Sequence, residues 1–290
     1  MKQPRSIWEF EKFGTNWSIE TDRPLSEATR RTISRRLELF DRSYSRFRDD
    51  SLVTSMKKRT GLFSMPSDFS ALFHFYENLY SLTDGKVTPL IGEMLEQAGY
   101  DSTYSLTSKG DFAELPKLSD VFTFNNETKM ATVTQPITLD FGAAGKGYAV
   151  DIIAEIIEKE VDQYTIDASG DMRHRGSVPE RVGLEHPADP TKVIGVMGLK
   201  NRSLCASASN RRAWRGMHHI MDPTARKSVD TVVATWVVAD DTLHADGIAT
   251  ALFFMKNPEV LQETFSFDFV RMFHDGVVDY SPGFEGELFI

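Results

Sequence analysis

The second half of the sequence constrains the fold most, because strand-like runs follow one another there with little helix between them. Each run is rich in apolar and β-branched residues and is bounded by residues that favour turns. The runs cover residues 164–168, 181–185, 192–199, 204–208, 229–238, 267–273 and 277–280. The last two flank Asp275-Gly276, a typical hairpin turn. Strands that follow one another without crossover helices pair antiparallel, so we expect a largely antiparallel sheet.

Helical periodicity dominates the first third of the chain. Apolar residues spaced by three and four predict a helix over residues 26–47 with a basic outer face. The same spacing predicts a second helix over residues 67–82, whose dense aromatic side chains favour a core role over cofactor stacking. Among the late strands we expect one long helix over residues 242–255, with Asp240 and Asp241 as capping candidates. The predicted fold class is therefore α+β, a largely antiparallel sheet with packed helices.

Composition excludes several classes of protein. Lys and Arg number 33 against 42 Asp and Glu, and the net charge of −9 disfavours a nucleic-acid partner. Cys205 is the only cysteine, which excludes an intrachain disulfide and a cysteine-based zinc site. No repeat or linker interrupts the chain, so we expect one domain over residues 1–290. The start lacks the apolar core of a signal peptide, and the longest apolar runs have about nine residues, half of a membrane span. A cytoplasmic protein without a membrane span is expected.

A glycine-rich loop lies between a predicted strand and a predicted helix. Residues 137–141 alternate in polarity, three glycines then break the period between 142 and 147, and helical spacing resumes at Ala149. Backbone N–H groups at a helix start, with Lys146 beside them, would suit a phosphate. The spacing is neither that of a P-loop nor that of a dinucleotide-binding loop. A phosphate loop and a plain strand-to-helix turn both remain open.

Two further segments carry side chains suited to chemistry. Asp246 and Thr250 are four residues apart, so on a helix they share one face and could bind a hard cation; a capped helix turn is the alternative. His218 and His219 point to opposite faces of an extended chain, so at most one of them addresses a given site. A histidine with the ordinary pKa of about 6.5 is mostly neutral at pH 7 and can accept a proton.

Taken together, these segments resemble the ApbE family of FAD:protein FMN transferases. The match covers most of the chain and is most specific at residues 139–151, 169–171, 219–223 and 245–251, which resemble "lDlggiaKGyavD", "GGD", "HIIDP" and "ADALaTa". Residues 13–15, 41–51 and 83–89 resemble the family's Met-Gly-Thr, "D..fS.y...Se" and T-G-G-x-F-D-P-T stretches. Thr88 stands where the family has an aspartate, and Ser169 stands where it has a glycine.

The resemblance implies a single ApbE-like, T-fold-related domain and a role for each matched residue. The enzyme would transfer FMN from FAD to a Thr or Ser hydroxyl of an acceptor flavoprotein and release AMP, with Mg²⁺ as cofactor. The base would be His219. The metal ligands would be the Ala143 carbonyl, Asp246 and Thr250. The FAD contacts would be Phe13, Phe47, Lys86, Val87, Thr88, Asp140 and Lys146. An FAD pyrophosphatase that gives FMN and AMP, or a non-catalytic FAD-binding protein, are the alternatives.

Overall fold

The computed structural model describes residues 6–110 and 112–289, and the chain is folded into two compact units. Unit 1 takes the chain up to Glu38, Ala144–Asn210, and the chain from Asp230 onward. Unit 2 takes Leu39–Ala143 and Arg211–Val229. The chain therefore passes between the units four times. The expectation of one domain over residues 1–290 stays a prediction.

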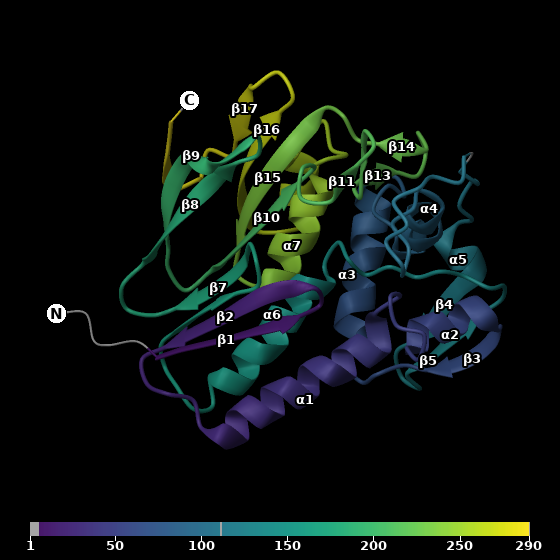
Figure 1. The fold of residues 1–290 in the computed structure, drawn as a ribbon, viewed down its shortest axis with the longest axis horizontal. Coiled ribbons are helices and arrows are strands. Elements are labelled where there is room, and N and C mark those ends of the chain that lie inside the picture. The colour runs from purple at the N-terminus through teal and green to yellow at the C-terminus, as the bar shows by residue number, and fades with distance from the viewer. Residues whose placement is uncertain (1–5, 111, 290) are drawn as a thin grey trace. The chain divides into compact units, whose positions relative to one another are not determined.

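Unit 1 is built on one large antiparallel sheet, called the main sheet below (Figure 1). Within the described residues it has eight strands in the order β1-β2-β6-β7-β10-β15-β16-β17. They are β1 (Ser6–Lys12), β2 (Thr15–Thr21), β6 (Tyr164–Asp167), β7 (Asp171–Arg175), β10 (Ser203–Ala208), β15 (Val232–Ala239), β16 (Phe267–Phe273) and β17 (Val278–Tyr280). Adjacent strands pair antiparallel throughout, which confirms the predicted α+β fold class.

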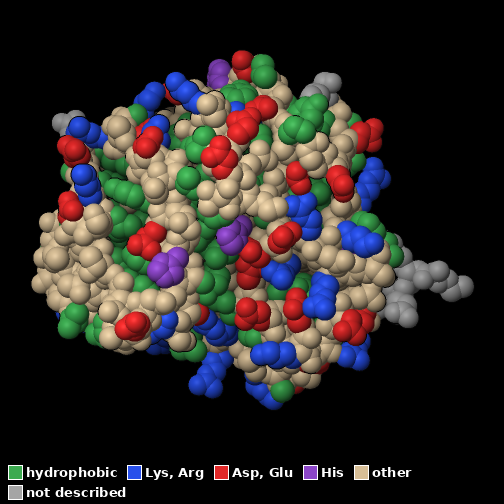
Figure 2. Space-filling model, turned by 180° about the vertical axis from the view of Figure 1, so that it is seen from behind, with side chains coloured by type: hydrophobic (Ala, Val, Ile, Leu, Met, Phe, Trp, Pro, Cys, Tyr) green, Lys and Arg blue, Asp and Glu red, His purple; other side chains and the backbone are tan. Residues whose placement is uncertain are grey.

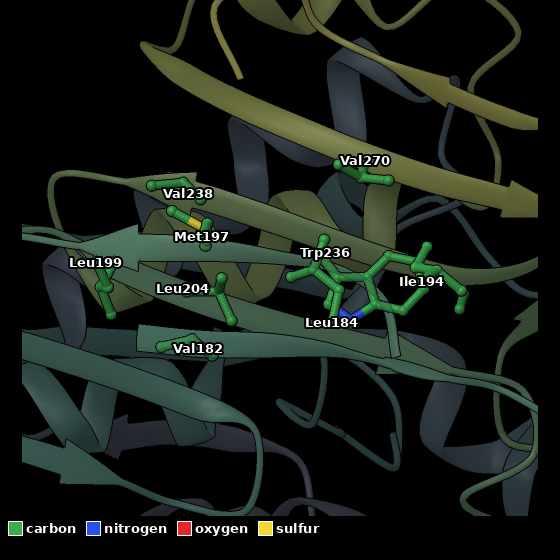
Figure 3. Packing of buried hydrophobic residues seen from close by; sticks show 10 residues of the cluster. Val182, Leu184, Ile194, Met197, Leu199, Leu204, Trp236, Val238 and Val270 are labelled. Atoms are coloured by element: carbon green, nitrogen blue, oxygen red, sulfur yellow. The ribbon is translucent and has the colours of Figure 1, made fainter. Parts of the chain in front are cut away.

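A smaller sheet packs on the main sheet through an apolar layer. Its strands are β18 (Gly286–Leu288), β9 (Asp189–Leu199) and β8 (Glu180–His186), in that order. Leu184 and Leu199 from this sheet meet Leu204 and Trp236 from the main sheet, and all four are buried (Figure 3). Alternating residues of β8, β9 and β15 supply this layer, so the period of two that predicted the strands also builds the core.

Two helices of unit 1, α6 (Gly145–Ile157) and α7 (Thr242–Ala251), pack on each other and on strands of the main sheet. The predicted cap Asp241 is confirmed, since its Oδ1 accepts a hydrogen bond from His244 N at 2.8 Å. The predicted end at residue 255 is wrong. After Ala251 the bonds shorten to i→i+3, with Phe253 N on Thr250 O, and the helix stops. The remaining helices there are α8 (Glu259–Gln262) and α1 (Glu27–Tyr44), which runs from unit 1 into unit 2.

Unit 2 combines several helices and short strands, and its core is rich in aromatic side chains. Its long helix, α3 (Phe69–Leu82), confirms the prediction over residues 67–82, and Phe69, Leu72 and Tyr76 are fully buried. The other elements are α2 (Leu52–Lys58), β3 (Gly61–Ser64), η1 (Pro89–Ile91), α4 (Gly92–Gln97), α5 (Leu118–Val121), β4 (Phe122–Asn125), β5 (Met130–Val133), β11 (Ala213–Trp214), β12 (Met217–His218), β13 (Met221–Asp222) and β14 (Lys227–Ser228). The aromatic side chains of α3 therefore form core, as expected.

Two local predictions are wrong. Residues 137–141 do not form a strand: Ile137 N donates to Met56 O at 3.1 Å and Asp140 N to Pro89 O at 2.7 Å, so single bonds to other segments replace a ladder. The first third also contains a hairpin, β1–β2, which the helical interpretation overlooked. Its two-residue turn is Phe13-Gly14, with φ of 54° and 67°. Such a turn requires positive φ at both positions and normally begins with Asn, Asp or Gly. Because Phe13 occupies the first position, nothing in the sequence indicated a hairpin turn here.

Charged side chains of both signs are interspersed over the face of the molecule shown in Figure 2. Some charged side chains form ion pairs between different segments of the chain, and within unit 2 Lys57 pairs with Glu96. Within the described residues, no helix combines the length and the apolar character that crossing a bilayer requires.

The contact between α6 and α7 depends on one buried carboxylate. Asp151 of α6 accepts hydrogen bonds from the first two N–H groups of α7, on Thr242 at 2.9 Å and Leu243 at 2.7 Å. Its other contact is an ion pair with Arg173. Burial raises the pKa of Asp151 in spite of Arg173 and these hydrogen bonds. Asp151 thus fixes where α7 begins.

We expect Asp151→Ala to lower the free energy of unfolding by about 2–4 kcal/mol, because two helix N–H groups lose their acceptor and Arg173 loses one of its carboxylate partners. Urea unfolding of the purified protein measures the loss. Asp241→Ala is the matched control: it removes the more exposed cap of the same helix and should cost about 1 kcal/mol. Equal losses in the two variants would contradict a special role for Asp151.

Candidate functional site

In unit 1, Lys146 lies in the first turn of α6 and its ammonium group points at the end of a neighbouring strand. It donates to Ala168 O at 2.8 Å and lies 3.1 Å from Asp171 Oδ2, with Ser169 O at 3.4 Å. Burial alone would lower the pKa of Lys146, but the carboxylates of Asp171 and Asp246 outweigh it and raise the pKa. Lys146 is therefore charged, and protein groups already surround its three donors.

The turn that receives Lys146 is held in an unusual conformation. Ser169 and Gly170 have φ of 56° and 102°, in the region that favours glycine. Ser169 occupies it because its Oγ donates to Asn16 O at 2.8 Å. Asp171 follows at the start of β7, only 1% exposed, and burial raises its pKa in spite of Lys146. The serine that departs from the family pattern thus keeps the backbone that a glycine would adopt.

Asp246 and Thr250 lie on α7 as predicted, one turn apart on the same face. Asp246 is 5% exposed, and its Oδ2 accepts a hydrogen bond from Gly147 N at 2.9 Å. A side chain at Gly147 would not fit, because its Cβ would lie 2.2 Å from Thr242 O and 2.6 Å from Asp246 Cβ. The glycine at position 147 therefore also allows the start of α6 to pack closely against α7.

The chemistry of this pair suits Mg²⁺, which prefers a small number of oxygen ligands and takes the others from phosphate and water. Within the described residues there is no cluster of three or more His, Cys, Asp or Glu side chains that could hold a metal alone. Asp246 and Thr250 would therefore need oxygens from a substrate or from the backbone. Ala143, the expected carbonyl ligand, is the last residue of unit 2, and Ala144 caps α6 as the first residue of the next unit 1 segment.

In unit 2, Asp140 forms a buried ion pair with Arg46. Arg46 Nε donates to Asp140 Oδ2, and Gly142 N donates to Asp140 Oδ1 at 2.7 Å. Burial would raise the pKa of Asp140, but the Arg46 guanidinium outweighs it and holds the pKa below its usual range. The same guanidinium lies 4.1 Å from the ring centroid of Phe47 and 5.0 Å from that of Tyr100. Asp140 is thus a fixed negative charge in an aromatic surrounding.

His219 lies at the edge of the same aromatic group. Its ring centroid is 6.5 Å from that of Tyr100, and its backbone N–H donates to Arg212 O at 3.3 Å. Its Nδ1 is shielded from solvent and has no hydrogen-bond partner among residues 6–110 and 112–289. His218, in contrast, holds Val229 O at 2.7 Å through Nε2. Of the two histidines, His219 is the one with a ring nitrogen left for other chemistry.

The pKa of His219 differs from the sequence-based expectation. Burial, with Arg212 and His218 nearby, lowers it to about 3, and Asp140 offsets this only in part. The ordinary value of about 6.5 assumed from the sequence is therefore wrong for this histidine. Its imidazole is neutral over the whole physiological pH range.

The remaining predicted contacts are placed as follows. Lys86 Nζ lies 3.4 Å from Asp222 Oδ2, which joins the 83–89 and 219–223 segments within unit 2. Val87 is buried, and Thr88 Oγ1 accepts from Leu90 N at 3.2 Å to cap η1, a role that an aspartate could also fill. Phe13 lies in the hairpin turn of unit 1, with its ring against Trp17.

Phe47 stacks almost parallel on Tyr104, with ring centroids 5.5 Å apart. No role was predicted for Tyr100, Tyr104 or Arg212, and Arg46 was predicted only as part of the matched stretch at residues 41–51. Their side chains meet because residues far apart in the chain fold together. The one local signal was the alternation of arginine with aromatic residues around Phe47.

Comparison with known proteins identifies the family. The model of the ApbE family matches residues 13–266, so the chain belongs to the ApbE family. It is 22% identical over 260 residues to an FAD:protein FMN transferase of Haemophilus influenzae, covering 82% of this chain and 75% of the relative. A Vibrio cholerae protein of the same name is 22% identical over 252 residues, covering 79% and 74%. Family and relatives indicate a transferase, which confirms the resemblance found in the sequence.

Solved structures support the fold. The ApbE protein of Thermotoga maritima superposes with a TM-score of 0.82 at 20% identity, covering 96% of this chain and 97% of that one. The flavin transferase ApbE of Vibrio cholerae gives a TM-score of 0.81 at 20% identity, covering 97% and 98%. At this identity the likeness concerns the fold, and the predicted ApbE-like architecture is confirmed.

The low pKa of His219 makes stability depend on pH. The unfolded chain binds a proton at this histidine below about pH 6.5, whereas the folded protein does so only near pH 3, so acid favours unfolding in between. We expect the free energy of unfolding to fall by up to about 1.4 kcal/mol per pH unit from this group between pH 6.5 and 4.5. Denaturant unfolding at several pH values in wild type and His219→Gln isolates it.

The variant should lose that part of the pH slope. His274→Gln, at an exposed turn, is the control and should keep it. A slope that is the same in His219→Gln as in the wild type would show that the ring is solvated.

Proposed function

We propose that this protein transfers FMN from FAD to a Thr or Ser hydroxyl of an acceptor protein and releases AMP. The relatives named FAD:protein FMN transferase and the family match support flavin transfer. The observation that carries the finer proposal is the buried carboxylate of Asp246, which α7 holds against the first turn of α6. Asp246 shares one face of α7 with Thr250, so the two side chains could present oxygen ligands to one hard cation.

Asp246 and Thr250 would hold Mg²⁺, with the Ala143 carbonyl as a third ligand. When bound, the metal would neutralise negative charge that develops on the phosphoryl oxygens. Two or three protein oxygens leave room for oxygens of the FAD diphosphate in the metal shell. In this proposal the protein binds its metal best together with its substrate.

His219 would act as the general base. Its neutral imidazole takes the proton from the acceptor hydroxyl as the hydroxyl oxygen attacks the FMN phosphorus. The bond from that phosphorus to the bridging oxygen breaks, and AMP leaves with the bond's electron pair. Because the pKa of His219 is about 3, its ring stays unprotonated well below pH 6.5 and would remain available to accept the hydroxyl proton.

The other site residues would bind FAD. Lys146 would contribute positive charge near the diphosphate, and Asp140 would present a fixed carboxylate in unit 2. Phe13, Phe47, Lys86, Val87 and Thr88 are the further proposed contacts. The acceptor would be a flavoprotein, and we propose a cytoplasmic site of action, with residues 1–290 acting as one functional domain.

The transfer can be tested by mass spectrometry of a candidate acceptor after incubation with the protein, FAD and Mg²⁺. We expect the acceptor to gain the mass of FMN minus water on a Thr or Ser. Asp246→Asn should lower the rate by about a hundredfold or more, since the charged ligand is lost. Asp240→Asn is the control, because Asp240 is 82% exposed just before the same helix.

The outcome also separates the alternatives. Free FMN and AMP without a modified acceptor would identify an FAD pyrophosphatase. FAD that stays bound and intact in the presence of Mg²⁺ and an acceptor would identify a non-catalytic FAD-binding protein.

Lys146 needs a test that separates binding from folding, because its removal leaves Asp171 buried and unpaired. We expect Lys146→Met to weaken FAD binding at low salt, with the loss shrinking as salt screens the charge. Asp171→Asn keeps the lysine charge, so its affinity for FAD should equal or exceed that of the wild type. If both variants lose the same affinity, Lys146 only supports the turn at residues 168–171.

A further inference from the structure

Arg46 is a buried cation whose hydrogen-bonding capacity is only partly used. Its side chain is 3% exposed, and Nε is engaged by Asp140. Its Nη1 and Nη2 are both shielded from solvent and have no hydrogen-bond partner among the residues that the structure describes. The rings of Phe47 and Tyr100 lie over the guanidinium but accept no conventional hydrogen bond.

Such an arrangement is costly unless an acceptor arrives. A buried donor without a partner is costly, and a charged donor costs more. A cation over aromatic faces recovers only part of this. Natural structures leave few such groups, and they often mark a place where a ligand binds. The two Nη groups therefore point to an acceptor other than the residues that the structure describes.

The surroundings of Arg46 define the chemistry of that acceptor. Asp140 already balances the charge of the guanidinium, so a second full anion such as a phosphate is not required. The neighbouring walls are aromatic: Phe47 and Tyr100. A neutral, planar ring system with an acceptor-rich edge fits both features, because it can stack on the rings and meet the N–H groups in its plane.

One neighbouring side chain can make way for such a ring. Tyr104 stacks on Phe47 at an interplanar angle of 7°, yet it is 54% exposed and has a φ of 51°. That conformation is unfavourable for a tyrosine, and its displacement from Phe47 would remove little buried contact. A ligand ring could take the position of the Tyr104 ring on Phe47, whose own ring centroid lies 4.1 Å from the Arg46 guanidinium.

We propose that Arg46 recognises a carbonyl oxygen on the pyrimidine end of the flavin ring, and so selects flavin within FAD. This inference rests on the proposed function. FAD has two ring systems, and only the flavin carries carbonyl oxygens; adenine offers ring nitrogens alone. Arg46 is then a specificity residue for the FMN half of the substrate, while the adenine half is bound elsewhere.

The test uses riboflavin and two analogues in which sulfur replaces one carbonyl oxygen, 2-thioriboflavin and 4-thioriboflavin. Sulfur is a poor acceptor, so one of the two analogues should bind wild type about tenfold more weakly than riboflavin. In Arg46→Met that penalty should fall below about twofold, as in a double-mutant cycle. ADP, which lacks the flavin ring, should bind both proteins equally. Quenching of flavin fluorescence gives the flavin affinities, and calorimetry gives that of ADP.

Arg48→Met is the matched control, since Arg48 lies two residues away and pairs with Asp41 and Asp50. It should keep the full analogue penalty. Because Arg46→Met leaves Asp140 unpaired, the double variant Arg46→Met/Asp140→Asn provides the same comparison without a buried lone carboxylate.

Two results would overturn the proposal: both thio analogues binding wild type as tightly as riboflavin, or the penalty persisting in the Arg46 variants. The first needs no variant, so poor folding cannot obscure it. Failure of the proposed function would look different, since riboflavin recognition through Arg46 would persist while no acceptor gains FMN.

Discussion

The close approach of α6 and α7 is the constraint on which the chemistry of unit 1 depends. It requires a glycine at position 147, where any side chain would meet the Thr242 carbonyl, and a carboxylate at Asp151 that binds the first N–H groups of α7. Given that contact, Asp246 comes to accept a hydrogen bond from the backbone of the glycine loop. The glycine loop, whose sequence suggested a phosphate site, therefore has a structural role: it allows α6 to pack closely against α7.

In both units, carboxylates with little solvent exposure form ion pairs with basic side chains. Three carboxylates of the matched segments lie against basic side chains: Asp171 against Lys146, Asp151 against Arg173, and Asp140 against Arg46. Pairs of this kind add little net stability but become strongly destabilising when one member is lost. Each pair joins side chains from segments that are distant in the sequence.

Much of this organisation could be predicted from the sequence, and the failures have physical causes. Strands β6, β10, β15, β16 and β17 were predictable because short apolar and β-branched runs bounded by turn residues favour strands, whereas β7 was not predicted. The β1–β2 hairpin was not, because Phe13 occupies a left-handed position that usually carries Asn, Asp or Gly. Residues 137–141 alternate in polarity as a strand does, but their backbone groups form single hydrogen bonds to separate segments and no strand ladder. The low pKa of His219 depends on Arg212 and on burial, and neither is visible in a local pattern.

The segments of the two units alternate along the chain, and this order determines when each unit can fold during synthesis. Strand β2 near the start pairs with β6, which begins at Tyr164, and β15 pairs with β16, which ends at Phe273. The main sheet therefore cannot be completed until almost the entire chain has left the ribosome. The long unit 2 segment, Leu39–Ala143, emerges well before that. During synthesis β2 therefore lacks its β6 partner until more than a hundred further residues have been made, and an unpaired strand edge of this kind favours aggregation.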